Sequence, residues 1–118
     1  MSKQKPKTVR VLLVDDHEIV RVGLRTVLGH HDFILVVGES ATVADAIRQT
    51  EKLRPDVILM DVRLPDGSGI DACRDILASL PHIRVIFLTS YADDDSVLAA
   101  VLAGAQGYVL KAIDSGSL

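Results

Sequence analysis

Five short aliphatic runs, separated by segments with helical spacing, constrain the fold of this 118-residue chain more than any other feature. The first four runs are almost continuously apolar, which is typical of parallel strands buried on both faces. We expect strands at Val9–Val14, Phe33–Gly38, Val57–Met60, Val85–Leu88 and Gly107–Leu110. Strict alternation of strand and helix predicts an α/β fold, a doubly wound parallel sheet with right-handed crossovers.

The segments between the runs carry helix start and stop signals. Asp16 is expected to cap the first helix, and Gly29 to follow its last turn as a C′ residue. Thr42 and Ser68 open capping-box-like sequences and are expected to cap the second and third helices. The inward face of the first helix is expected to hold Val20, Leu24, Val27 and Leu28.

The end of the chain completes the predicted organisation. A fourth helix is expected over roughly 94–103, and a fifth helix beginning near Ser115 would be truncated or absent, because the sequence stops at Leu118. The length suits one domain. We therefore predict a disordered tail over 1–8 and one domain over 9–118 that lacks most of its last helix.

Composition excludes several classes of protein. The net charge is −3 and basic residues cluster only at Lys3–Lys7, so the electrostatic footprint of a nucleic-acid-binding protein is lacking. The single cysteine, Cys73, excludes an internal disulfide, and no apolar run approaches the roughly 18 residues of a membrane span. We expect a soluble, cytoplasmic protein. The four histidines lack metal-ligand spacing and are interpreted as surface residues.

Polar residues stand directly after four of the predicted strands. Asp15 and Asp16 follow the first strand, Asp61 the third, Thr89 the fourth and Lys111 the fifth. If the strand order is the flavodoxin-like 2-1-3-4-5, the three carboxylates share one crevice at the carboxyl edge of the sheet. Like charges this close need a cation, and oxygen ligands beside a phosphate favour Mg²⁺. With the Lys111 ammonium opposite, such a site suits acceptance of a phosphoryl group.

These residues, taken in order, resemble the receiver domain of bacterial two-component response regulators over roughly Val9 to Leu118. The segments Leu12–Glu18, Asp61–Gly69 and Ala103–Tyr108 are similar to the NarL/LuxR-type subfamily of DNA-binding regulators. The resemblance implies that a sensor histidine kinase donates a phosphoryl group to the chain. It also implies an output domain outside this chain, through which the parent protein would bind DNA and control transcription.

The resemblance assigns roles to the residues around the predicted crevice. Asp61 would be the phosphoacceptor. Asp16, Asp61 and the Arg63 backbone carbonyl would hold Mg²⁺, with Asp15 acting mainly through a bound water.

The resemblance also implies a switch. Thr89 and Lys111 would each bind an oxygen of the transferred phosphoryl group, and Tyr108 would move inward into the space that Thr89 leaves. This coupling remodels the surface around the fourth helix and fifth strand. That surface is expected to form a phosphorylation-dependent homodimer or to contact the output domain.

Other functions fit the residues less well. Asp15 and Asp16 alone could be a strand-to-helix turn, and Asp61 alone could begin a Pro-Asp-Gly turn. A Mg²⁺-dependent phosphohydrolase with an aspartyl nucleophile is the main alternative, but it usually has a second acid where this chain has Arg63. A pseudo-receiver would not need the whole acidic pocket, and a nucleotide-binding protein would need a glycine-rich loop after the first strand. The chain is interpreted as a signalling module and not as an enzyme.

Overall fold

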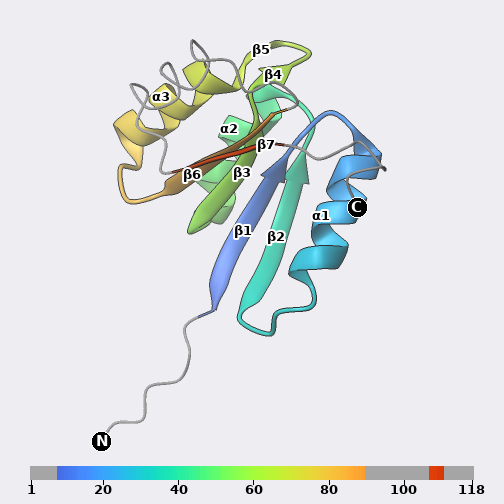
Figure 1. The fold of residues 1–118 in the computed structure, drawn as a ribbon. Coiled ribbons are helices and arrows are strands. Elements are labelled where there is room, and N and C mark those ends of the chain that lie inside the picture. The colour runs from blue at the N-terminus through green and yellow to red at the C-terminus, as the bar shows by residue number, and fades with distance from the viewer. Residues whose placement is uncertain (1–7, 90–106, 111–118) are drawn as a thin grey trace, which may run out of the picture.

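The computed structural model of the chain describes residues 8–89 and 107–110 (Figure 1). Its main sheet has five strands in the order β2-β1-β3-β6-β7, and all four neighbouring pairs are parallel. Because β6 and β7 are the fourth and fifth strands of this sheet along the chain, the predicted order 2-1-3-4-5 is confirmed. The strands are β1 (Val9–Val14), β2 (Ile34–Ser40), β3 (Val57–Asp61), β6 (Arg84–Thr89) and β7 (Gly107–Leu110).

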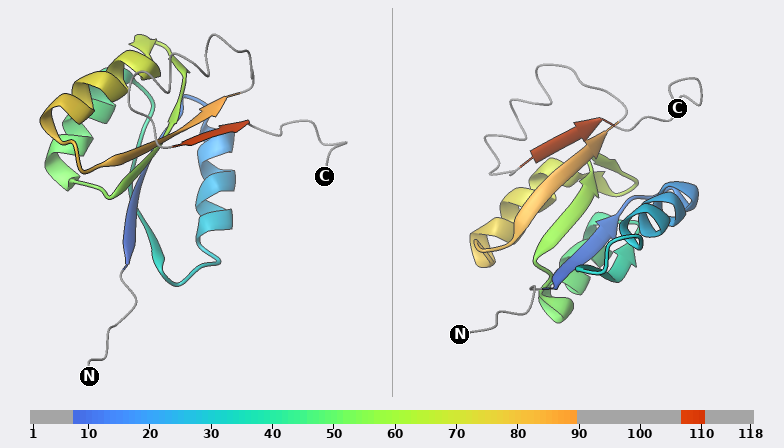
Figure 2. Two further views of the ribbon diagram at one scale, coloured as in Figure 1. Left: turned by 60° about the vertical axis from the view of Figure 1, so that its left-hand side comes forward. Right: turned by 60° about the horizontal axis from the view of Figure 1, so that its bottom comes forward.

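Three helices of the described residues lie on the two faces of this sheet. α2 (Val43–Leu53) and α3 (Gly69–Ser79) cover one face, and α1 (Glu18–Leu28) covers the other (Figure 2, left). This placement confirms the doubly wound architecture. No helix within the described part of the chain is long and apolar enough to cross a membrane.

The strand ends differ slightly from their predicted positions. Asp61 and Thr89 are the last residues of β3 and β6, whereas the apolar runs alone end one residue earlier. The ladder continues through the pairs Asp61↔Leu88 and Thr89↔Leu110, because backbone pairing does not require an apolar side chain. Asp61 and Thr89 therefore belong to the paired strands of the sheet and not to the loops that follow.

The ends of α1 correct two predictions. The N-cap is His17 and not Asp16, and its side chain makes no capping hydrogen bond. Instead the His17 amide donates to Asp15 Oδ1 over 2.9 Å, so the acid before Asp16 fixes the turn. Gly29 is the C-cap of the helix, in a right-handed conformation with φ −67°, and not the C′ residue beyond the cap.

The N-caps of α2 and α3 are confirmed. Thr42 Oγ1 accepts a hydrogen bond of 3.1 Å from the Asp45 amide. Ser68 Oγ accepts one of 3.1 Å from the Ile70 amide. Each cap satisfies backbone donors that have no partner within the helix, which fixes where these helices begin.

The hydrophobic core lies between the sheet and the α2/α3 layer. Phe87 at its centre is fully buried, as is Cys73 of α3, whose thiol pKa burial raises to about 11. The predicted inward face of α1 is only partly correct, because Val20, Leu24 and Leu28 are half-buried and Val27 is 59% exposed. The strands and helices of the core contribute Leu12, Val14, Ala46, Ile58, Met60, Ile76 and Val85 among others.

Several predictions fall outside the described residues. These are the tail up to residue 7, the helix over 94–103, the end of the chain with its fifth helix, and Lys111. They stay predictions.

Candidate functional site

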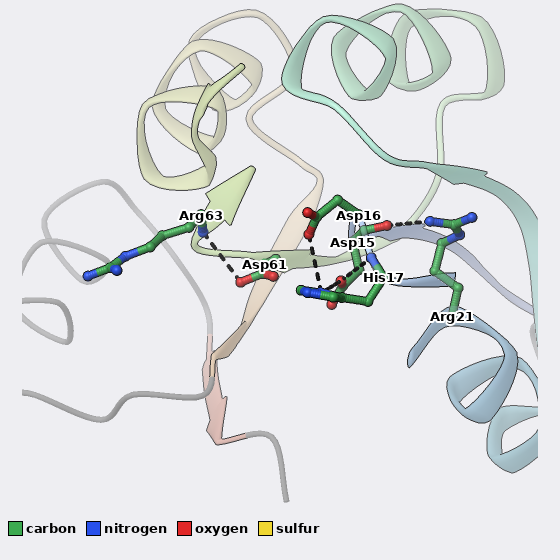
Figure 3. A network of polar contacts seen from close by, with 6 residues as sticks. All are labelled: Asp15, Asp16, His17, Arg21, Asp61 and Arg63. Atoms are coloured by element: carbon green, nitrogen blue, oxygen red, sulfur yellow. Dashed lines mark hydrogen bonds and ion pairs between the residues drawn. The ribbon is translucent and has the colours of Figure 1, made fainter. Parts of the chain in front are cut away.

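Three acids and one histidine gather at the carboxyl end of β1 and β3 (Figure 3). Asp15, Asp16 and His17 follow β1, Asp61 ends β3, and these two strands are neighbours in the sheet. One carboxylate oxygen from each acid and one ring nitrogen of His17 all lie within 4.8 Å of one another. The predicted meeting of the three carboxylates is therefore confirmed.

Two of the three carboxylates in this cluster are buried, so their negative charges need positive charge or hydrogen-bond donors nearby. Asp15 is 0% exposed and Asp61 is 7% exposed, whereas Asp16 is exposed. Like charges held close together away from water raise the free energy of the folded state unless positive charge or hydrogen-bond donors oppose them. A crevice of carboxylate oxygens is a donor set that suits a hard divalent cation such as Mg²⁺. The residues present thus fit a metal ion.

His17 is the member of the cluster that sequence reasoning missed. Its Nδ1 lies 2.9 Å from Asp15 Oδ1 and 3.2 Å from Asp16 Oδ1, so the imidazole contacts both acids (Figure 3). The lack of metal-ligand spacing predicts that every histidine is a surface residue with no part in the site. The position directly after two adjacent acids was the signal that could have identified His17.

The segment after Asp61 folds back tightly on β3. β4 (Arg63–Leu64) and β5 (Gly67–Ser68) form a two-residue antiparallel ladder around the predicted turn. The Arg63 amide donates to Asp61 Oδ1 over 3.3 Å, and the Gly69 amide donates to the Val62 carbonyl over 2.7 Å. A Cβ on Gly69 would lie 2.0 Å from the Asp61 carbonyl oxygen, so only glycine allows this approach.

The same hairpin is tied to the start of α2. The Asp66 carboxylate accepts hydrogen bonds of 2.7 Å from the Val43 amide and 3.0 Å from the Ala44 amide, across more than 20 residues of sequence. These backbone hydrogen bonds lower the pKa of Asp66. An anion at a helix N-terminus is also stabilised by the helix dipole. Asp66 therefore links the loop after Asp61 to a second element.

α1 is held to the strand ends by charge. Arg21 donates to the Asp15 backbone carbonyl and, over 2.9 Å, to Glu39 Oε1, while Arg25 pairs with Glu39 Oε2. Partial burial raises the pKa of Glu39, but the hydrogen bonds and positive charges of Arg25 and Arg21 outweigh it and lower the pKa overall. This network fixes the backbone of Asp15 against both α1 and β2.

The backbone positions of two further predicted residues are described. Thr89 ends β6, beside β3, and Tyr108 lies in β7, where it pairs with Phe87. Thr89 therefore belongs to the strand adjacent to that of Asp61, as the predicted crevice requires. The roles predicted for the Thr89 and Tyr108 side chains and for Lys111 are not tested by this geometry.

A doubly wound five-stranded sheet with clustered acids at its carboxyl edge defines a flavodoxin-like domain with an acidic ion site. A family model described as the response regulator receiver domain matches residues 11–118. The chain belongs to this family, and it is the receiver domain of a response regulator.

Similar proteins agree with this assignment. The chain is 53% identical over 105 residues to the DNA-binding transcriptional activator DevR/DosR of Mycobacterium tuberculosis, covering 89% of this chain and 48% of that protein. It is 41% identical over 110 residues to the response regulator protein VraR of Staphylococcus epidermidis, covering 93% of this chain and 53% of that protein. The chain thus spans about half the length of these curated relatives.

Solved structures share the fold. A LuxR-family two-component response regulator from Aurantimonas sp. SI85-9A1 matches with a TM-score of 0.86 and 38% identity, over 92% of this chain and 77% of that chain. The isolated receiver domain of RcsB from Salmonella enterica serovar Typhimurium, solved in the presence of phosphomimetic BeF3-, matches with a TM-score of 0.84 and 30% identity, over 89% of this chain and 78% of that chain. The predicted resemblance to the NarL/LuxR-type subfamily is therefore confirmed.

Proposed function

We propose that this receiver domain accepts a phosphoryl group on Asp61 from the phosphohistidine of a sensor histidine kinase. The observation that carries the proposal is the placement of Asp61, which ends β3 nearly buried with its carboxylate inside the acidic cluster. Membership of the receiver family and the similarity to a receiver solved with a phosphate mimic support the same role.

The metal of the proposed site is Mg²⁺. Asp15, Asp16, Asp61 and the backbone carbonyl of Arg63 would hold it, directly or through water. A bound Mg²⁺ neutralises negative charge on the oxygens of the group that is transferred. The chain's own contribution is to keep the acids in place through the Arg63 amide on Asp61 and the His17 amide on Asp15.

The bonds made and broken in the proposed transfer involve only the donor and the Asp61 side chain. A carboxylate oxygen of Asp61 attacks the phosphorus atom, a P–O bond forms and the P–N bond to the donor imidazole breaks, leaving its electron pair on nitrogen. Thr89 and Lys111 then each bind an oxygen of the new acyl phosphate, and Tyr108 moves inward. Because these steps transfer one phosphoryl group and then change the conformation, the domain acts as a switch and not as an enzyme with multiple turnovers.

The proposed switch acts through a surface of the domain that contacts other protein domains. We propose that phosphorylation stabilises a homodimer or changes the contact with a DNA-binding output domain outside this chain, in a cytoplasmic transcription regulator. The similarity to a DNA-binding transcriptional activator of about twice the length supports this organisation.

Phosphorylation can be tested with the chain, Mg²⁺ and a small acyl phosphate donor. We expect one acid-stable, hydroxylamine-labile phosphate per chain, and no label on Asp61→Asn, because an amide is not a nucleophile for this transfer. Asp75→Asn, on an exposed position of α3, is the matched control and should label normally.

Two results would contradict the proposal. A label that persists in Asp61→Asn places the phosphate elsewhere. Release of many phosphates per chain from a range of phosphate esters would favour the phosphohydrolase alternative.

A further inference from the structure

We propose that His17 is a nitrogen ligand of the acidic site, so that the site binds imidazole-preferring divalent ions, with Zn²⁺ as the representative, more tightly than its carboxylates alone would allow. This inference rests on the proposed function, because it uses the same three acids. It adds to the site a ligand atom that Mg²⁺ seldom uses.

The spacing of the three atoms carries the inference. When a divalent ion has bonds of about 2.1 Å, adjacent ligand atoms are about 3 Å apart in an octahedral sphere and about 3.4 Å apart in a tetrahedral one. His17 Nδ1 lies 2.9 Å from Asp15 Oδ1 and 3.2 Å from Asp16 Oδ1. The imidazole nitrogen and the two carboxylate oxygens thus already have the separations of neighbouring ligands.

The backbone holds the imidazole beside the acids. The His17 amide donates to Asp15 Oδ1, and Asp15 is fully buried, so the start of the His17 side chain cannot move far from the cluster. The His17 side chain itself is 60% exposed, so a metal ion from solvent can reach its ring while Nδ1 stays beside the two acids. A backbone anchor this close to the acids limits how far the ring has to be reoriented to become a ligand.

The chemical type of the ligand atoms decides which ions the site binds more tightly. Carboxylate, carbonyl and water oxygens suit Mg²⁺, whereas imidazole raises the affinity for Zn²⁺ and other late divalent ions of the first transition row. His17 therefore changes the selectivity of the site more than its affinity for Mg²⁺. Because both ions use the oxygens of Asp15 and Asp16, they compete for one position.

The decisive measurement compares Zn²⁺ and Mg²⁺ affinities by titration calorimetry in wild type, His17→Gln and His82→Gln. Glutamine keeps a polar side chain at position 17 but removes the imidazole, and His82 is an exposed histidine near the amino ends of the strands. The ratio of Zn²⁺ to Mg²⁺ affinity should fall at least about tenfold in His17→Gln and stay unchanged in His82→Gln. An unchanged ratio in His17→Gln, including an equal loss for both ions, would overturn the proposal.

A second readout observes the ligand atom. In the full chain with ¹⁵N-labelled histidine, stoichiometric Zn²⁺ should shift the Nδ1 resonance of His17, and prior Asp16→Asn substitution should weaken that shift. No shift at His17 Nδ1 would overturn the proposal even if Zn²⁺ binds.

The two proposals fail in different ways. If wild type does not label from the acyl phosphate in Mg²⁺ but His17 still controls Zn²⁺ selectivity, the phosphoacceptor function fails and the metal inference stands. If Asp61 is phosphorylated and the ratio of Zn²⁺ to Mg²⁺ affinity is the same in wild type and His17→Gln, only the metal inference fails.

Discussion

The two faces of the sheet are attached to their helices by different forces. On one face, α3 buries Ile70, Cys73 and Ile76 in an apolar core that also contains Phe87. On the other face, α1 has no buried residue and is joined to β2 through the ion pairs of Arg21 and Arg25 with Glu39. The first face is therefore stabilised by apolar burial that pH hardly changes, whereas the contact of α1 with β2 combines half-buried apolar residues with charge.

The largest expected effect tests the apolar face. Phe87→Ala should lower the free energy of unfolding by about 3–5 kcal/mol, because it removes a fully buried ring from the core. Ile19→Ala, at an 81% exposed position on α1, should change it by no more than about 0.5 kcal/mol. Urea denaturation of both variants checks this contrast. Equal losses would show that the two faces do not differ as described.

A pair of glycines sharpens the comparison. Gly69→Ala should lower the free energy of unfolding by about 1–3 kcal/mol, because its new methyl group would meet the Asp61 backbone. Gly23→Ala on α1 should raise it by about 0.5–1 kcal/mol, because nothing lies within 4 Å of the added methyl and alanine favours helix. Thermal melts should therefore shift in opposite directions. A shift of the same sign in both would contradict the prediction.

The smallest effect concerns the charged face. Glu39→Gln should cost about 0.5–1 kcal/mol at neutral pH, in the range of a partly exposed ion pair. Since the folded-state pKa of Glu39 is lowered, its carboxylate stabilises the fold above the ordinary glutamate pKa, and this stabilisation is lost as the pH falls through the folded-state value.

The difference in free energy of unfolding between wild type and Glu39→Gln should thus disappear in acid, and it should become smaller in high salt. Denaturation series at several pH values measure it. Glu51→Gln, at an exposed position on α2, should show no such gap. A gap that widens on acidification would refute the assigned role.

The sheet and the acidic part of the site could be predicted because each follows from a local signal. Continuous apolar runs gave the buried strands, and the rule that parallel strands end at one edge brought Asp15 and Asp61 together. The caps at Thr42 and Ser68 were predicted from their own residues.

His17 was missed although its contact is local: its amide binds Asp15, two residues earlier, which replaces the expected capping by Asp16. The remaining features depend on contacts between segments that local patterns do not encode. The contact of Asp66 with α2 joins segments distant in sequence, and the close approach of Gly69 to Asp61 exists only once α3 packs on β3. Tertiary packing decided these details, and helix or turn propensity did not.

The carboxylate of Asp66 makes the hairpin and the first turn of α2 one mechanical unit. A displacement of residues 62–68 has to carry that turn with it or rupture the hydrogen bonds from Val43 and Ala44. The exchange of those two amides with solvent deuterium therefore reports, from another helix, how the loop beside Asp61 responds to a change of charge there.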